Sequence, residues 1–294
     1  MNSVAFRPDV ALDAQHRHLI IDLAATLDDE ASLREAGGDL MLQACLNGTR
    51  LADAHPSVPI SPYQLARYAR AVAELGVRSV HVHPRCGQGL ETIEAHHVGE
   101  VVAAIRSSVA AMEVVVPSAR WVAPDPRRRV EAVTGWGRLG LAKPDVVAVS
   151  VGEQGWWEIC AAACAQGIGL ELGVWTPGDA VRLRLAGVPA GVVRVVVDVT
   201  VGDPVVAIAE AVRILRALGP VGVPVLLHGE DSSAWSVWRY ATETGLGSRI
   251  GLEDVLARPD GSPTRGNADL VEHALRIRPG GLPDAASPGV APLR

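Results

Sequence analysis

Eight short apolar runs recur at regular spacing along this chain of 294 residues, and a helical pattern follows each of them. The runs cover residues 40–46, 77–83, 112–116, 145–151, 168–174, 192–199, 223–229 and 248–254. Several are almost purely aliphatic, which is typical of strands buried on both faces of a parallel sheet. Eight strand–helix units predict an α/β fold of the (β/α)8 or TIM barrel type. An open doubly wound sheet is the alternative, but the loop Asn47-Gly48-Thr49 after the first run lacks the glycine fingerprint of that fold.

Two of the predicted helices carry clear start signals. Ser61 is followed by Pro62 and, three residues later, by Gln64, which is the pattern of a capping box with proline at the first helical position. Thr176, Pro177 and Asp179 repeat this pattern before the helix that follows the fifth run. We therefore expect both helices to begin at these prolines.

Composition and domain organisation point to a single catalytic domain. We expect the barrel to cover residues 39–280, with an N-terminal extension over residues 1–38 and a C-terminal tail over 281–294. Hydrophobic residues make up 48% of the chain and charged residues 20%, which suits a well-filled core. A net charge of −6 offers no basic footprint for nucleic acid, and no apolar run is long enough for a membrane span. Four cysteines without CxxC spacing and without a secretory leader indicate a cytoplasmic protein.

The second run ends in two histidines, His81 and His83. Residues two apart on a strand point to the same side, so the two imidazoles converge at the strand end. Such a pair is half of a metal site, because the ion needs further ligands from elsewhere in the fold. The alternative is a pair of strand histidines that are hydrogen-bonded to their neighbours.

A second polar strand end favours the metal site. In the last run the same alternation puts Arg249, Gly251 and Glu253 on one face and leaves Asp254 at the loop edge. The second and eighth strands of a closed barrel both flank the first, so Glu253 can complete a site of two histidines and one glutamate. Three protein ligands leave an open position for a substrate, which is the catalytic arrangement of zinc.

Other predicted strand ends carry polar residues that would share the same mouth of the barrel. They are Asn47, Arg50, Ser118, Ser150, Glu171 and His228. His228 could line the site or simply cap the seventh strand, and Cys86 lies close enough in sequence to be a ligand or a bystander. We therefore treat this mouth as the candidate active site.

The order of these motifs resembles the β-keto acid cleavage enzymes over about residues 40–277. The motifs are Asn47-Gly48-Thr49-Arg50, His81-Val82-His83, Ser118, Arg249-Ile250-Gly251-Leu252-Glu253-Asp254 and Asn267-Ala268-Asp269-Leu270-Val271. The resemblance implies a zinc-dependent barrel enzyme that condenses a 3-oxo acid with acetyl-CoA and yields an acyl-CoA and acetoacetate. It implies that His81, His83 and Glu253 hold zinc, and that Ser118 helps to hold the substrate. It also implies that Asp254 with Arg249 serves the proton transfer.

The remaining expectations concern the substrate and the partners. We count Arg50, Asn47 and Glu171 with Ser118 as substrate-binding residues, and we expect a homo-oligomer. Arg50 stands where members acting on amine-bearing substrates have an acid, so it would favour a second carboxylate in the substrate. Its alternative is a surface arginine paired with Asp53 or another loop acid.

The chain departs from the family pattern at other positions as well. Val255 and Ser150 replace frequent asparagines, and Gly173 takes the place of the second acid of a pair that begins at Glu171. The alternatives for function are a metal-dependent hydrolase of the amidohydrolase type, which usually has its histidine pair on the first strand, and a non-catalytic binding barrel.

Overall fold

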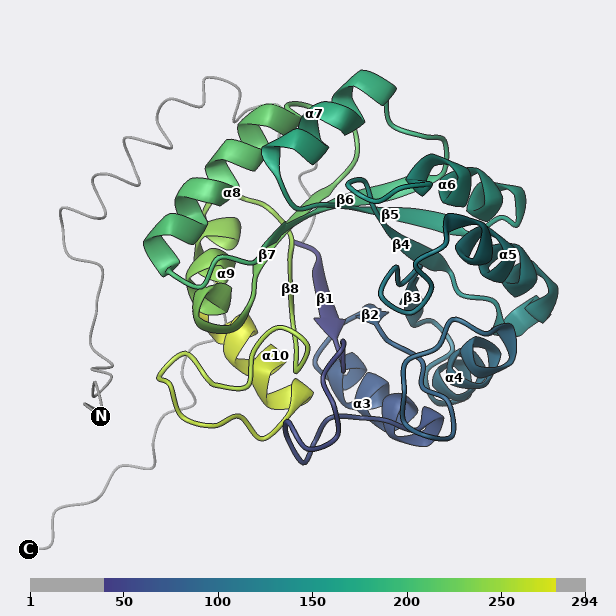
Figure 1. The fold of residues 1–294 in the computed structure, drawn as a ribbon. Coiled ribbons are helices and arrows are strands. Elements are labelled where there is room, and N and C mark those ends of the chain that lie inside the picture. Colours follow the sequence, from purple (N-terminus) through teal and green to yellow (C-terminus); the bar gives the residue numbers. More distant parts are fainter. Residues whose placement is uncertain (1–39, 279–294) are drawn as a thin grey trace, which may run out of the picture.

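Eight parallel strands and their helices form a (β/α)8 barrel in the computed structural model, which describes residues 40–278 (Figure 1). The strands are β1 (Leu42–Cys45), β2 (Ser79–His81), β3 (Glu113–Pro117), β4 (Val146–Ser150), β5 (Gly169–Val174), β6 (Val192–Val199), β7 (Val225–Gly229) and β8 (Ser248–Ile250). The expected fold class is confirmed. The expected extension 1–38 and tail 281–294 lie outside the described residues.

One helix follows each strand on the outside of the barrel. The helices are α3 (Pro62–Glu74), α4 (Ala95–Ser108), α5 (Pro126–Trp136), α6 (Trp156–Ala165), α7 (Pro177–Ala186), α8 (Pro204–Leu218), α9 (Ala234–Glu243) and α10 (Asn267–Ile277), with two short 3-10 turns, η1 (Gly137–Ala142) and η2 (Asp231–Ser233). Helices α3 and α7 begin at the predicted prolines, and both have capping boxes, built by Ser61 with Gln64 and by Thr176 with Asp179. None of the helices within residues 40–278 is both long and apolar enough to cross a lipid bilayer.

The strands pair in the order β7-β6-β5-β4-β3-β2-β1-β8, so β1 lies between β2 and β8. The barrel closes between β7 and β8 through one isolated bridge, Leu226 to Gly247. The amide of Leu227 donates to the carbonyl of Gly247 at 3.0 Å, and the hydroxyl of Ser248 donates to the carbonyl of Leu227 at 2.6 Å. The histidine pair therefore lies at the end of the second strand, as predicted, and not on the first strand, where the hydrolase alternative would place it.

One boundary differs from the sequence expectation. Strand β8 ends at Ile250, and the next residues fold into a turn in which the amide of Asp254 donates to the carbonyl of Gly251 at 3.0 Å. The expectation that strand alternation continues to Glu253 and leaves Asp254 at the rim is therefore wrong. The turn carries the Asp254 side chain inward, where it is fully buried.

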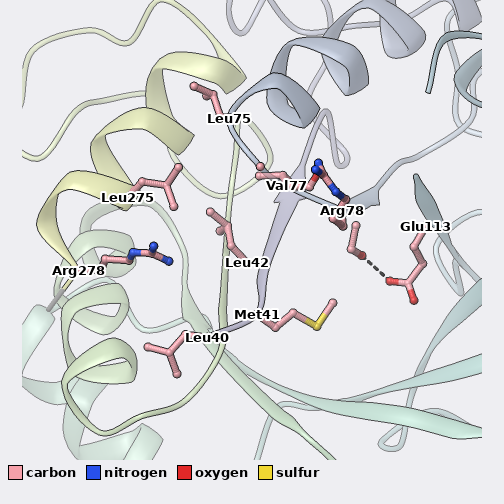
Figure 2. Close-up of a pocket in the computed structure, with 11 residues that line it drawn as sticks. Leu40, Met41, Leu42, Leu75, Val77, Arg78, Glu113, Leu275 and Arg278 are labelled. Carbon is pink, nitrogen blue, oxygen red and sulfur yellow. Dashed lines mark hydrogen bonds between the residues drawn. The ribbon is translucent and has the colours of Figure 1, made fainter. Parts of the chain in front are cut away.

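The amino ends of the strands enclose a cavity of about 480 Å³ on the face opposite the histidines (Figure 2). Leu42 and Leu275 line it from β1 and α10, and Glu113 lines it from β3, where its carboxylate accepts a hydrogen bond from the Ser79 hydroxyl at 2.6 Å. Arg194, also buried, bridges Glu113 and Glu171 inside the barrel at 2.6 Å each. A polar network thus fills the barrel toward the amino ends of the strands. The carboxyl ends of the strands remain open for a functional site.

Candidate active site

A second cavity, of about 350 Å³, opens at the carboxyl ends of the strands, where barrel active sites are built. Residues at or just after the ends of all eight strands line it. Of the predicted site residues it includes Arg50, His81, His83, Ser118, Glu171, Arg249 and Glu253. Asn47 and Asp254 do not line it. Both are fully buried next to it.

His81, His83 and Glu253 form the cluster of potential metal ligands in this cavity. Their ligand atoms all lie within 4.8 Å of one another. The two Nε2 atoms are 3.1 Å apart, and Oε1 of Glu253 lies 3.9 Å from Nε2 of His81 and 3.6 Å from Nε2 of His83. Two atoms bound to one zinc ion at about 2.1 Å and at tetrahedral angles lie about 3.4 Å apart, so this spacing fits such an ion. Oε2 of Glu253 is buried without a hydrogen-bond partner among residues 40–278, which is a further mark of a site built for a cation.

Two glycines let Glu253 reach the histidines. Gly48, in the turn after β1, has a φ of +53°, and a Cβ there would overlap the side chain of Glu253. A Cβ at Gly251 would overlap the main chain of Cys45 in β1. Both glycines are needed because the turn after β8 packs directly on the end of β1.

Polar partners orient both imidazoles from behind. Nδ1 of His83 lies 2.9 Å from Oε2 of Glu91, and Nδ1 of His81 lies 3.7 Å from Oε1 of Glu171. A carboxylate behind a ligating histidine keeps the proton on Nδ1 and leaves Nε2 free for a metal. The amide of Asn47 donates to the carbonyl of His83 at 2.8 Å and accepts from its N–H at 2.9 Å. Asn47 therefore holds the main chain of His83 in place. Its side chain does not line the cavity, so it has no direct access to a substrate there.

Charges in the cluster determine the protonation of these groups. Burial lowers the pKa of His81, which favours the neutral form that binds metals. Burial alone would raise the pKa of Glu253, but His81, Arg249 and His83 outweigh it and hold it well below its usual range. Burial opposes ionisation of Glu171 too, yet the neighbouring His81 and the charge of Arg194 lower its pKa. Both carboxylates are therefore ionised at neutral pH.

Asp254 belongs to a buried group beside the cluster. Its Oδ1 lies 3.4 Å from Nδ1 of His228 and 3.6 Å from the guanidinium of Arg249, which itself lies 2.9 Å from Glu253. On its other side His228 is hydrogen-bonded to Asp198, which lines the cavity. Burial raises the pKa of Asp254 to about 7, against the lowering effect of Arg249 and His228. His228 thus lies between Asp198 in the cavity wall and Asp254 behind it.

Arg50 lines the cavity and is at the same time paired with an acid. Its guanidinium donates to Asp231 at 2.7 Å and to the main-chain carbonyl of Glu253 at 3.1 Å. The structure thus contains the alternative arrangement considered for Arg50, with Asp231 as the loop acid. Ser118 follows β3 and also lines the cavity.

Sequence reasoning missed several residues of the site. Asp198 is the one acid in the aliphatic strand β6, and this interruption is a signal that could have found it. Glu91 and Trp121 lie in loops with no local pattern. Trp121 stacks on His83 with ring centroids 5.7 Å apart and donates its indole N–H to Glu91 at 2.7 Å.

Comparisons with known proteins agree with this fold and indicate a family. A family model described as beta-keto acid cleavage enzyme matches residues 39–280. Among solved structures, the binary complex of ObcA with oxaloacetate is similar, with a TM-score of 0.57 and 15% identity, covering 74% of this chain and 62% of that chain. The ternary complex of ObcA with a C4-CoA adduct and oxalate gives a TM-score of 0.57 at 16% identity, with coverages of 74% and 62%.

A third similar structure is the type I 3-dehydroquinate dehydratase from Clostridium difficile, with a TM-score of 0.55, 10% identity and coverages of 81% and 91%. At such identities these structures establish the barrel fold alone, and this chain spans only about three fifths of the length of the ObcA chains. A search of curated proteins found no match.

Proposed function

This chain belongs to the β-keto acid cleavage enzyme family, and from that premise we propose that it is a zinc-dependent acyltransferase that converts a 3-oxo acid and acetyl-CoA into an acyl-CoA and acetoacetate. The observation that carries this proposal is the convergence of His81, His83 and Glu253 in a cavity that also holds Arg249. These three ligands leave an open position, as catalytic zinc sites do.

The products dictate which bonds change. Acetoacetate contains the acetyl group of acetyl-CoA joined to the two carboxyl-end carbons of the 3-oxo acid. The new bond therefore joins C2 of the 3-oxo acid to the thioester carbonyl carbon and releases the CoA thiolate. This thiolate takes the acyl group when the bond between C2 and C3 breaks. A proton must leave C2 first, so the site needs a base.

Zinc held by His81, His83 and Glu253 would supply Lewis-acid polarisation of the keto group, which makes the C2 proton more acidic. Ser118 presents a hydroxyl at the cavity wall that can bind a substrate oxygen. Arg249 offers a buried positive charge beside Glu253, which suits a substrate carboxylate or a developing enolate.

The proton acceptor is proposed to be Asp254, paired with Arg249. Because Asp254 is buried, it can exchange a proton with the cavity only through its neighbours, and His228 with Asp198 offers that route. A pKa near neutrality suits a group that must both take up and return a proton.

The reaction is tested by incubating purified, zinc-loaded protein with acetyl-CoA and a panel of 3-oxo acids. Acetoacetate and the matching acyl-CoA should form in equal amounts. Neither product should form when acetyl-CoA or the 3-oxo acid is left out. His81→Ala should abolish turnover, whereas His96→Ala, at an exposed position on α4, should not. A protein that releases acetate and free CoA instead would be a thioesterase, and the proposal would fall.

The base is tested with two isosteric variants. Asp254→Asn should keep metal content and fold but lose at least roughly a hundredfold in turnover, which is the usual scale for a removed acid–base group. Asp198→Asn should lower turnover less than Asp254→Asn does, because it interrupts only the path by which the proton reaches the cavity. A larger loss of turnover for Asp198→Asn would mean that Asp198 is the base.

A further inference from the structure

The wall of the candidate active site divides into two chemically different sides. The ionic side consists of residues in or just after β6, β7, β8 and β1, namely Asp198, Glu230, Asp231, Arg249 and Arg50. The aromatic side consists of Trp121 and Trp175, which follow β3 and β5. A substrate whose keto group faces the histidines can direct its tail toward either side.

The cations of the ionic side already have partners. Arg50 is bound to Asp231 and to a main-chain carbonyl, and Arg249 is paired with Glu253. An acidic tail would have to displace Asp231, and it would also face Glu230. Arg249 serves the carboxylate or enolate that every 3-oxo acid has. A second carboxylate would gain little at Arg50, which Asp231 already neutralises, so this side does not favour a second negative charge.

The aromatic side offers surface that is not used by the fold. Trp121 is 48% exposed although one face of its indole stacks on His83, and Trp175 is 44% exposed. The position of Trp121 is fixed by its hydrogen bond to Glu91. Exposed indole faces next to a reaction centre are contact area for an apolar group.

A glycine makes room for the second indole. Nε1 of Trp175 and Oδ2 of Asp198 each lie 3.2 Å from the point where a Cβ at Gly173 would stand, and Gly173 itself lines the cavity beside Ser150. Any side chain at this position would push the indole edge away. Two acids line the cavity near this side. Glu171, in β5, is paired with Arg194 at 2.6 Å. The other is Glu153, in the loop after β4. It is paired with Arg129 at 2.5 Å, so it adds no free charge.

From this division, and resting on the proposed function, we infer that the preferred 3-oxo acid carries an uncharged, apolar tail, aliphatic or aromatic, that lies against Trp121 and Trp175. The adenine of acetyl-CoA is not the expected occupant. A diphosphate and the pantetheine arm separate it from the reacting thioester, whereas Trp121 touches a residue of the metal cluster. The aromatic side therefore sets specificity for the acyl group.

The test compares four 3-oxo acids at fixed acetyl-CoA: 3-oxooctanoate, 3-oxo-3-phenylpropanoate, the dicarboxylate 3-oxoadipate and the short neutral 3-oxopentanoate. The wild-type kcat/KM for the two apolar acids should exceed that for 3-oxoadipate by at least about tenfold. Trp175→Ala should lower kcat/KM for the apolar acids by about tenfold or more. It should leave the kcat/KM for 3-oxopentanoate and the KM for acetyl-CoA nearly unchanged.

Trp157→Ala is the matched control, because Trp157 is also 44% exposed but lies on α6 outside the cavity lining. It should leave the ranking of substrates unchanged. A preference for 3-oxoadipate would overturn the inference in favour of Arg50, and an equal loss on all four acids or a raised KM for acetyl-CoA would overturn it as well.

Calorimetric binding of the same acids to zinc-loaded protein separates this inference from the proposed reaction. If no acid gives acetoacetate, the reaction is wrong. Tighter binding of the apolar acids that is lost in Trp175→Ala would still support the apolar tail site, and tighter binding of 3-oxoadipate would still reject it.

Discussion

Gly48 illustrates how one residue without a side chain can position a functional residue elsewhere in the sequence. It holds a positive φ, and its bare Cα leaves the space through which Glu253 reaches the two histidines. Asn47, its neighbour, fixes the main chain of His83. The turn after β1 therefore supports ligands from two other strands without supplying one itself.

Replacing Gly48 by alanine should weaken metal binding even though no ligand is changed. The new Cβ would displace the Glu253 side chain, and a misplaced ligand or support typically costs tenfold or more in affinity. The measurement is the zinc dissociation constant from competition with a chromophoric chelator. Gly76→Ala is the matched control, since Gly76 also has a positive φ, of +96°, but an added Cβ there meets no atom within 4 Å.

Both variants should lose about 1 kcal/mol of unfolding free energy, because alanine is strained at positive φ. Only Gly48→Ala should lose zinc affinity. Equal zinc affinity in both variants would mean that Gly48 serves the turn alone.

At this scale the sequence could identify which residues come together but not how. The alternation of His81 and His83 correctly predicted that their rings converge. Glu253 reaches the same point by way of a turn and not by strand alternation, and this turn buries Asp254. A turn that depends on close packing between Gly251 and the main chain of Cys45 leaves no periodic signal in a single sequence.

Single elements were predictable where their signals are local. The starts of α3 and α7 follow from proline and a capping box within four residues, and both are confirmed. The start of α10 has no proline or capping box: its first turn is held by a side chain that binds the loop directly before the helix. Asp269 is paired with Arg258 at 2.7 Å and with Arg265 at 2.8 Å, and it accepts a hydrogen bond from the Thr264 hydroxyl at 3.0 Å.

Asp269 should make the link between this loop and α10 sensitive to acid. Burial alone would raise its pKa, but the hydrogen bonds from Arg258, Arg265 and Thr264 outweigh it and lower it below the ordinary value of 3.8. The folded state thus holds this proton more weakly than the unfolded chain. The stabilisation is therefore fully present above about pH 4 and is lost as the pH falls further.

Asp269→Asn should lower the free energy of unfolding by about 2 kcal/mol at neutral pH, the scale of hydrogen bonds to a charged group. The difference from wild type should shrink below about pH 4, which urea titrations at several pH values would measure. Asp203→Asn is the control, because asparagine caps a helix start such as that of α8 about as well as aspartate. A difference that stays constant with pH would contradict the electrostatic account.

The whole molecule was predictable as a barrel because eight apolar runs at regular spacing have few other solutions. How the barrel closes was not predictable, since β7 and β8 meet through one isolated bridge and two hydrogen bonds instead of a regular ladder. The metal cluster joins the two strands that flank β1: His81 lies in β2, His83 follows it, and Glu253 follows β8. An ion held there would link an early strand of the chain to the last one. The expected homo-oligomer stays a prediction at this scale.

Zinc should therefore raise the thermal stability of the whole domain. A ligand at a hundred times its dissociation constant adds about 2.7 kcal/mol if it binds the native state alone. For a domain of this size that corresponds to a rise in Tm of roughly 5–10 °C. Calorimetry of chelator-treated protein with and without added zinc measures the shift. His81→Ala should show none, and an equal shift in that variant would place the bound zinc elsewhere.

The position of Glu253 after the last strand also has a consequence for how the protein is made. The two histidines leave the ribosome early, whereas the carboxylate follows only after nearly all of the barrel has been synthesised. Until then a captured ion has two imidazoles to hold it, and it can exchange. Tight metal binding and docking of the final strand are thus expected to occur together, late in folding. A ribosome-stalled chain that stops before β8 should carry folded helices but no retained zinc.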